Sequence, residues 1–267
     1  MARRRLGKKG VSEVVGTVML VTVTLGTVVA AVFFAQLNLS MQAQATEFEN
    51  SKASMVSLAQ MIEGLSLAKG SAAYTRFAIR SGGLALTPGT ESLTITIEGT
   101  TVFEDRINLV RLRGGGGVSS LDFMVLKGVP NTMPTECLII SPENSAPLGW
   151  VYLKREQGAW VIMDFGRVRV VPSGVIQTTS DGVNWDPVNV VEITYVKIVY
   201  GTFSGRDVYD VCAKVVNVTT QVIKFPDAIR ITVRVERGSS SEEYASDQGG
   251  NDTIVFLNIV EIELSVR

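Results

Sequence analysis

The sequence predicts a long N-terminal α-helix, with a transmembrane half and an amphipathic half, followed by a mainly antiparallel all-β head of the sandwich type. Two observations predict the helix: an uncharged apolar run from Val14 to Ala35, and a helical period in the apolar residues of 46–69. A third observation predicts the head: apolar and polar residues alternate in many segments after Tyr74.

The apolar run is long enough to cross a bilayer, because an apolar helix needs about 20 residues at 1.5 Å rise each. No Asp, Glu, Lys or Arg occurs between Glu13 and Glu47. A basic head precedes the run over residues 3–9, and Lys and Arg stay on the cytoplasmic side of a membrane. We therefore expect a single-pass protein with a cytoplasmic N-terminus and an extracellular C-terminal domain.

Three interpretations of this segment differ in where, or whether, the chain is cut. A cleaved secretory signal has an apolar core of about 7 to 15 residues with a small-x-small site close behind. Here the run is too long, and Ala43-Gln44-Ala45 lies well beyond its end. A plain signal anchor needs only the length and the charge asymmetry, and both are present.

The third interpretation rests on the junction Lys8-Lys9-Gly10-Val11-Ser12-Glu13-Val14-Val15-Gly16-Thr17. This junction resembles the start of archaeal type IV pilin-like precursors, which carry a class III signal peptide. The resemblance implies that a prepilin peptidase cuts between Gly10 and Val11, with Lys8 and Lys9 as the basic pair before the cut. The mature chain would then keep its hydrophobic helix.

The resemblance also implies a role for Glu13, which would be the third residue of the mature chain, whereas bacterial pilins carry their Glu at the fifth. The resemblance implies that Glu13 makes a subunit contact or pairs with the new N-terminal amine, and a carboxylate is favoured near the positive end of the helix dipole. Residues 48–86 look similar to larger archaeal pilin-like surface proteins. A homo- or hetero-oligomer through the N-terminal helix, assembled into a surface filament, is the expected consequence.

The chain divides into three parts by composition. A basic leader spans 1–10, the helix spans 11–70 with a predicted stop at Lys69-Gly70-Ser71, and a β-rich head spans 71–267. A glycine-rich polar gap at 114–120 is a candidate division of the head. The helical period of the second half comes from Phe48, Met55, Leu58, Ile62 and Leu65.

Strands are predicted wherever β-branched residues alternate with polar ones. The clearest segments are 75–80, 92–98, 167–170, 192–200, 230–237 and 254–266. Glu156-Gln157-Gly158 predicts a hairpin turn between two further strands. The Ser- and acid-rich segment Gly238–Asp252 predicts an exposed loop.

Composition excludes several kinds of function. The net charge is −1, which gives nucleic acid no electrostatic attraction, and the absence of histidine removes His-based catalysis and His-based zinc sites. The glycine run at 114–117 lacks the residues of a phosphate loop. We identify no catalytic, cofactor-binding or metal-binding residue and no small-molecule substrate, and carboxylates are the only candidate catalysts.

Modification and surface contacts are suggested at a few positions. Cys137 and Cys212 are a candidate disulfide in an oxidising exterior, with two free thiols as the alternative. Trp185, in a turn-like segment, is the aromatic residue expected at the surface. The candidate N-glycosylation sites are Asn38, Asn217 and Asn251.

These observations favour a non-enzymatic, membrane-inserted, pilin-like cell-surface protein, such as a minor pilin, a pseudopilin or a component of a surface appendage. The first alternative is a signal-anchored β domain that binds the surface layer or a neighbouring surface protein without polymerising. The second is an anchored exterior hydrolase that uses carboxylates alone.

Overall fold

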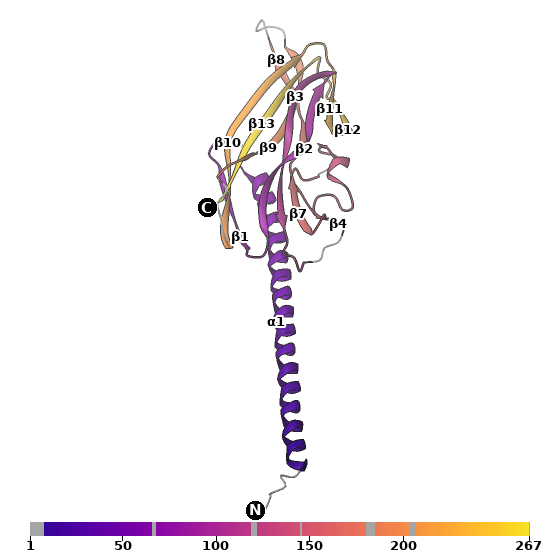
Figure 1. Ribbon diagram of the computed structural model, residues 1–267. Coiled ribbons are helices and arrows are strands. Elements are labelled where there is room, and N and C mark those ends of the chain that lie inside the picture. The colour runs from indigo at the N-terminus through magenta and orange to yellow at the C-terminus, as the bar shows by residue number, and fades with distance from the viewer. Residues whose placement is uncertain are drawn as a thin grey trace, which may run out of the picture.

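In the computed structural model, one long helix projects from a β head (Figure 1). The structure describes residues 8–65, 68–118, 122–144, 146–179, 185–202 and 207–266; for residues 8–13 and 207 it describes the backbone only. The termini of the described chain lie far apart, because the helix carries the N-terminus away from the head (Figure 1). This arrangement confirms the predicted fold class.

The helix α1 runs from Lys8 to Gly64 without interruption. It ends before the stop predicted at Lys69. Glycine has a low helix propensity, and the Leu65 amide donates to the Ile62 carbonyl at 3.3 Å, which tightens the last turn. The helix therefore ends at Gly64, before it reaches the predicted stop at Lys69.

The strands form two sheets, which we call sheet A and sheet B. Most neighbours are antiparallel, while β9–β13 and β5–β8 are parallel. A short 3-10 helix, η1, spans Pro134–Glu136. Sheet A has the order β1 (Ala72–Ile79), β10 (Asp207–Phe225), β13 (Asp252–Val266), β9 (Asp186–Tyr200), β8 (Val168–Thr178) and β5 (Ile139–Ile140). Sheet B has the order β12 (Ser240–Asp247), β11 (Arg230–Arg237), β2 (Gly83–Ile97), β3 (Thr100–Arg113), β7 (Ala159–Asp164), β6 (Trp150–Arg155) and β4 (Phe123–Lys127).

The C-terminal half of α1 packs between the two sheets at the lower end of the head (Figure 1). Its buried side chains share one hydrophobic cluster with residues of both sheets, for example Val211 and Ile262 of sheet A and Leu112 and Val161 of sheet B. The helical residues of this cluster are Phe48, Met55, Leu58, Ala59 and Ile62. The helix is therefore part of the core of the head.

A second cluster, farther from the helix, joins the sheets directly. Tyr195 belongs to this cluster and its neighbour Val196 to the first, and the same holds for Ile259 and Val260. Successive side chains of a strand point to opposite faces. Sheet A is therefore buried on one face toward the helix and on the other toward β2 and β11.

The predicted loop Gly238–Asp252 is wrong for most of its length, because residues 240–247 form β12 and pair with β11. Gly238 supplies the positive φ of 57° that the tight connection requires. Every second residue of β12 is less exposed than its neighbours. Because serine and glutamate occupy most of the less exposed positions, the sequence of this strand does not alternate between apolar and polar residues.

The glycine-rich gap at 114–120 lies against the helix, as far as its described residues show. Gly114 donates to the Ala159 carbonyl at 2.9 Å, and a Cβ atom on it would lie 3.0 Å from the Phe48 ring. The Gly117 amide donates to Gln44 Oε1 at 3.0 Å. Residues 119 and 120 lie outside the described part of the chain.

Candidate functional site

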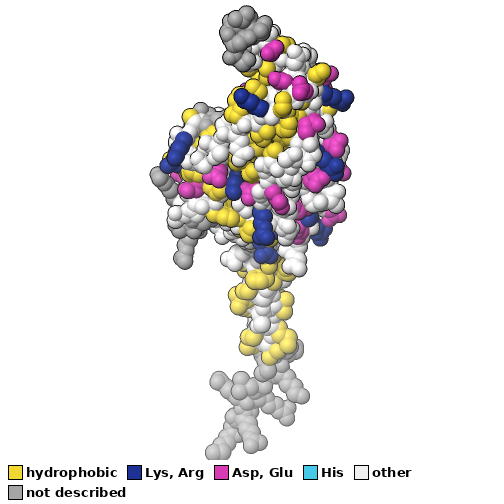
Figure 2. Space-filling model, turned by 90° about the horizontal axis from the view of Figure 1, so that it is seen from above, with side chains coloured by type: hydrophobic (Ala, Val, Ile, Leu, Met, Phe, Trp, Pro, Cys, Tyr) yellow, Lys and Arg dark blue, Asp and Glu magenta, His cyan; other side chains and the backbone are white. Residues whose placement is uncertain are grey.

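The apolar half of α1 is fully exposed along its length. Every side chain from Val14 to Ala43 is exposed, a stretch of about 45 Å at 1.5 Å per residue. Leu20 is 69% exposed and Phe34 is 65% exposed. These apolar side chains stand clear of the head (Figure 2). So large a contiguous apolar surface indicates contact with lipid or with other proteins.

The hydroxyl groups in this half are bonded to the helix itself. Each donates to a carbonyl three or four residues earlier: Thr17 to Val14, Thr22 to Val18, Thr24 to Leu20 and Thr27 to Val23, at 2.9, 2.8, 2.7 and 2.5 Å. A hydroxyl that is bonded in this way costs little in a medium without water. The helix surface is therefore suited to an apolar environment despite its threonines.

The lower junction between helix and head is built around Glu47, the first charged residue after the apolar half. Its Oε1 accepts hydrogen bonds from the Arg80 amide at 2.7 Å, the Ser81 amide at 2.9 Å and the Ser81 hydroxyl at 3.0 Å. Hydrogen bonds to a carboxylate are stronger than those between neutral groups. The carboxylate thus fixes the turn that follows β1 to the helix.

The upper junction is built around Glu63, in the last turn of α1. Its Oε1 accepts from the Gly149 amide at 2.5 Å, and its Oε2 lies 2.6 Å from Lys127 Nζ. Burial lowers the pKa of Lys127, and the hydrogen bond to Glu63 opposes this. Between the two junctions, the Ser54 hydroxyl donates to the Arg76 carbonyl at 3.0 Å. The helix is therefore held to the head at three levels.

No protein-family model, curated protein or solved structure matches this chain. The exposed apolar half and the two junctions therefore have to be interpreted from their own chemistry.

The predicted processing residues Lys8, Lys9, Gly10 and Val11 lie in the first turns of α1, as does Glu13. Only their backbone is described, and the basic residues 3–5 lie outside the described part of the chain. Their roles in cleavage and in subunit contact stay predictions.

The candidate disulfide is not formed: Cys137 and Cys212 are free thiols in the structure. Cys212 is buried in β10, which lies between β1 and β13. Cys137 is half-buried directly after η1, and burial raises the pKa of its thiol. Cys212 therefore lies on an inner strand of sheet A, whereas Cys137 lies in the loop before β5. The spacing of the two cysteines in the sequence does not reveal this difference.

The three candidate glycosylation sites are all exposed. Asn38 lies on the helix, Asn217 on β10 and Asn251 just before β13. Trp185 is 62% exposed, which confirms the expected surface position.

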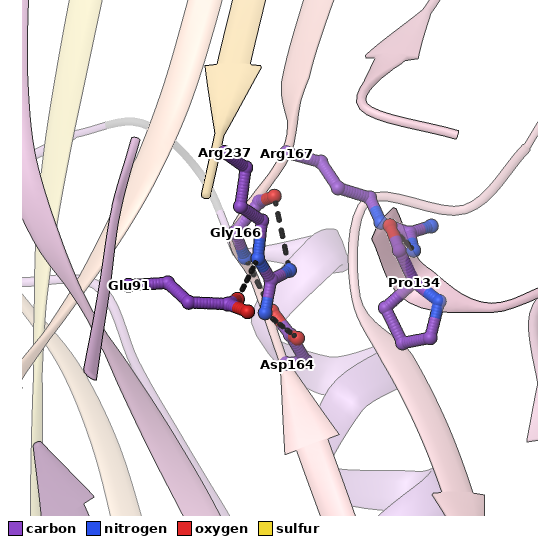
Figure 3. A network of polar contacts seen from close by, with 6 residues as sticks. All are labelled: Glu91, Pro134, Asp164, Gly166, Arg167 and Arg237. Atoms are coloured by element: carbon purple, nitrogen blue, oxygen red, sulfur yellow. Dashed lines mark hydrogen bonds and ion pairs between the residues drawn. The ribbon is translucent and has the colours of Figure 1, made fainter. Parts of the chain in front are cut away.

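A buried polar network is the feature that sequence reasoning missed (Figure 3). Asp164, with no exposed surface, lies 2.8 Å from Arg237 Nη2, and Arg237 Nε donates to Glu91 at 2.7 Å. The Gly166 amide donates to Asp164 Oδ1 at 2.7 Å. These residues come from β7, β11, β2 and the β7–β8 connection, so no spacing in the sequence brings them together.

A second buried arginine lies beside this network. The Arg167 guanidinium stacks on the Trp150 ring at 3.5 Å from its centroid and donates to the Pro134 carbonyl at 3.0 Å. Burial lowers the pKa of Arg167 to about 10. Arg167 lies where the chain passes from β7 of sheet B to β8 of sheet A, which indicates that it stabilises this connection.

A cavity of about 300 Å³ lies next to the network, and the carboxylates Glu91 and Glu156 are among the residues that line it. Glu91 pairs with Arg237, while Glu156 pairs with Lys154 at 2.8 Å and with Arg111. The hydrogen bond from Lys154 lowers the pKa of Glu156, the opposite of what a general acid needs.

Among the residues that the structure describes, no group of three acidic or cysteine side chains is placed to hold a metal ion.

Proposed function

We propose that this chain is a non-enzymatic, membrane-inserted, pilin-like protein of the cell surface, with its β head outside the cell. The observation that carries the proposal is the exposed apolar half of α1, which continues without a break into the core of the head. A membrane anchor needs only the exposed apolar helix. A filament subunit needs both the exposed apolar helix and its continuation into the core of the head.

The continuity of the helix supports a mechanical role. No proline occurs between Lys8 and Gly64, and the two junctions bind the helix on both sides of its buried segment. The head therefore has one orientation relative to the helix. In a filament, the position of each helix in the bundle would therefore fix the position of its head.

The surface of the apolar half supports helix–helix packing. Gly26 and Ala30 lie one turn apart, as do Ala31 and Ala35, so each pair shares a face. A Cβ atom on Gly26 would meet nothing within 4 Å. Small residues let neighbouring helices approach closely in lipid or in a filament core.

A second candidate is an anchored head that never polymerises. The run Val14–Ala35 would span about 33 Å, which matches one bilayer by itself. A helix of this length does not require neighbouring copies.

The mature N-terminus tests the proposal. Mass spectrometry of the terminal peptide from native membranes should show a start at Val11, and sheared surface fractions should contain the protein in filaments. A Gly10→Val variant should keep its leader and stay out of those fractions. A start at Met1 or Ala2 with no filament would favour the non-polymerising anchor. A start near Thr46 would overturn membrane insertion.

A further inference from the structure

The distal half of β10 is a free sheet edge. β1 pairs with β10 from Asp207 to Lys214, and Ser71 and Gly70 extend this pairing to Val215. From Asn217 to Phe225, β10 pairs with β13 on one side, and no described residue pairs with its backbone on the other. We call residues 217–225 the free edge. Its backbone N–H and C=O groups on that side are available to another strand.

Three other edges of the two sheets are protected against such pairing. β12 carries acidic side chains over 242–247. β8 carries Pro172 and a bulge before Gly174. β1 follows the helix, and its Arg76 carbonyl accepts from Ser54. Charges, proline, bulges and coverage are the usual means of blocking an edge.

The free edge has few of these protections: its one charged residue is Lys224, near its end, and the bulge of β10 lies before it, between Val215 and Asn217. No charged residue occurs from Val215 to Ile223, and no proline or glycine occurs from 217 to 225. Most of its residues are β-branched, and Val222 is 54% exposed. A segment of this composition with an open backbone favours the addition of a further strand.

We propose that the free edge pairs antiparallel with the free edge of a second copy of this chain, about a two-fold axis at Gln221. The space at the edge sets this register. β1 and Ser71 occupy the edge up to Val215, so an incoming strand has room only from residue 217 onward. Centring on Gln221 pairs the whole of 217–225 with itself. Centring on Thr220 would place Phe225 of the second copy against Val215, where Ser71 already pairs.

The same register avoids like charges, which supports a second copy as the occupant. The only charged residue of the free edge is Lys224, and it lies opposite Val218 of the second copy. Thr220 lies opposite Val222, and Thr219 opposite Ile223, which are favourable β-branched pairs. A two-fold contact of this kind uses the same surface on both copies.

The direction of β10 determines how the two copies are oriented. β1 runs back along α1, because its Arg76 lies at Ser54 and the following Arg80 lies at Glu47. β10 is antiparallel to β1 and therefore runs in the direction of α1. Antiparallel pairing of β10 with its copy consequently turns the two helices in opposite directions.

The free edge lies in the part of the head that is farthest from the N-terminus of the helix (Figure 1). The apolar halves of the two copies therefore point away from the contact on opposite sides. If the helix is anchored as proposed above, the contact joins two opposing surfaces; the pairing itself does not rest on that function. A single strand pair is a weak contact, and many copies on each surface would add their affinities.

Cross-linking of the full-length protein in detergent tests the pairing. In a Cys137→Ser, Cys212→Ala background, Gln221→Cys should form a disulfide-linked dimer, because opposite Cα atoms in an antiparallel pair lie about 4.5 to 5.5 Å apart. Val218→Cys should not, since its copies would be about 20 Å apart in this register. Equal cross-linking at both positions, or none at 221, would overturn the proposal.

A charge swap tests the register independently of thiols. Thr220→Lys with Val222→Lys places lysine opposite lysine twice and should abolish the dimer. Thr220→Lys with Val222→Glu places lysine opposite glutamate twice and should restore it. Both positions are exposed, so circular dichroism should show the same fold in both variants. Dimer loss in both double variants would contradict the pairing.

Liposomes test the orientation. Two populations that carry differently tagged Gln221→Cys protein should aggregate and yield mixed-tag dimers. Dimers confined to one tag would overturn the contact between surfaces. If the protein fails to insert into liposomes, the membrane function is wrong, while the detergent experiment still decides the pairing.

Discussion

Glu63 in the last turn of the helix and Lys127 on β4 form an ion pair of 2.6 Å, with side chains only 19% and 11% exposed. The pair joins the end of α1 to sheet B, and the same carboxylate accepts from the Gly149 amide. The helix that carries the apolar half is therefore fixed to the head by a charge that is largely removed from water.

Glu63→Gln should destabilise the protein by about 2 kcal/mol or more, because it leaves Lys127 buried without a countercharge. Urea unfolding of the full chain in detergent measures the change. Glu63→Gln with Lys127→Met should recover most of the loss. Glu49→Gln is the matched control: its partner Lys52 is on the same helix, and Glu49 is 67% exposed, so we expect less than about 1 kcal/mol. Equal effects of Glu63→Gln and Glu49→Gln would contradict this interpretation.

Gly114→Val should loosen the lower junction. A Cβ atom at this position would lie 3.0 Å from the Phe48 ring, so the branched side chain would force the helix outward at a cost of about 1 to 3 kcal/mol. Hydrogen exchange of residues 44–64 should accelerate. Gly116→Ala is the control, since a Cβ atom there meets nothing within 4 Å. Unchanged exchange in Gly114→Val would show that Phe48 is not held by this contact.

The sequence was sufficient for the helix and for most strands, because both signals are local. The uncharged run and the period of Phe48, Met55 and Leu58 predict one helix whose second half is buried, and the structure confirms this. Alternation predicts β9, β11 and β13 directly. β12 was not predicted, because its half-buried positions carry Ser240, Glu242 and Tyr244. Most of these side chains are as polar as those of the exposed positions between them, so the strand shows no apolar–polar alternation.

The features that fix the helix to the head could not be predicted from the sequence. Glu47, Glu63 and Lys127 act through contacts with backbone or side chains far along the chain. The same holds for Asp164 at the end of β7 and Arg237 at the end of β11, which form an ion pair although β2 and β3 lie between their strands in sheet B. Such pairs depend on the topology, and a single sequence contains no spacing that specifies it.

Arg237→Met should be among the most destabilising single substitutions in the head, at about 3 to 5 kcal/mol, since it leaves the fully buried Asp164 without its partner. Arg234→Met on the same strand is the control. Arg234 is 46% exposed and pairs with exposed glutamates, so we expect at most about 1 kcal/mol. Thermal unfolding of the two variants side by side measures the difference. Similar melting temperatures would mean that Asp164 finds another partner.

Glu156 should contribute to the loss of stability in acid. Hydrogen bonds from Lys154 and Arg111 hold its folded-state pKa below the unfolded value, so its contribution is present above that value and is lost as pH falls through the lower one. The side chain is 38% exposed, so screening keeps the effect below about 1 kcal/mol. Relative to the wild type, Glu156→Gln should lose less stability between pH 7 and strongly acidic pH. An unchanged pH dependence would show that the ion pair does not form in solution.

The position of a charge along the apolar half should decide whether the helix enters a membrane. Leu25→Arg places a charge near the middle of the Val14–Ala35 run and should weaken insertion by about 2.5 to 3.5 kcal/mol, so that alkaline carbonate extracts the protein from membranes. Leu39→Arg changes an equally exposed leucine beyond the run, where the charge stays in the water or the interface, and should leave the protein in the membrane. Extraction of both variants to the same extent would show that the whole uncharged stretch, rather than its first part, holds the protein in lipid.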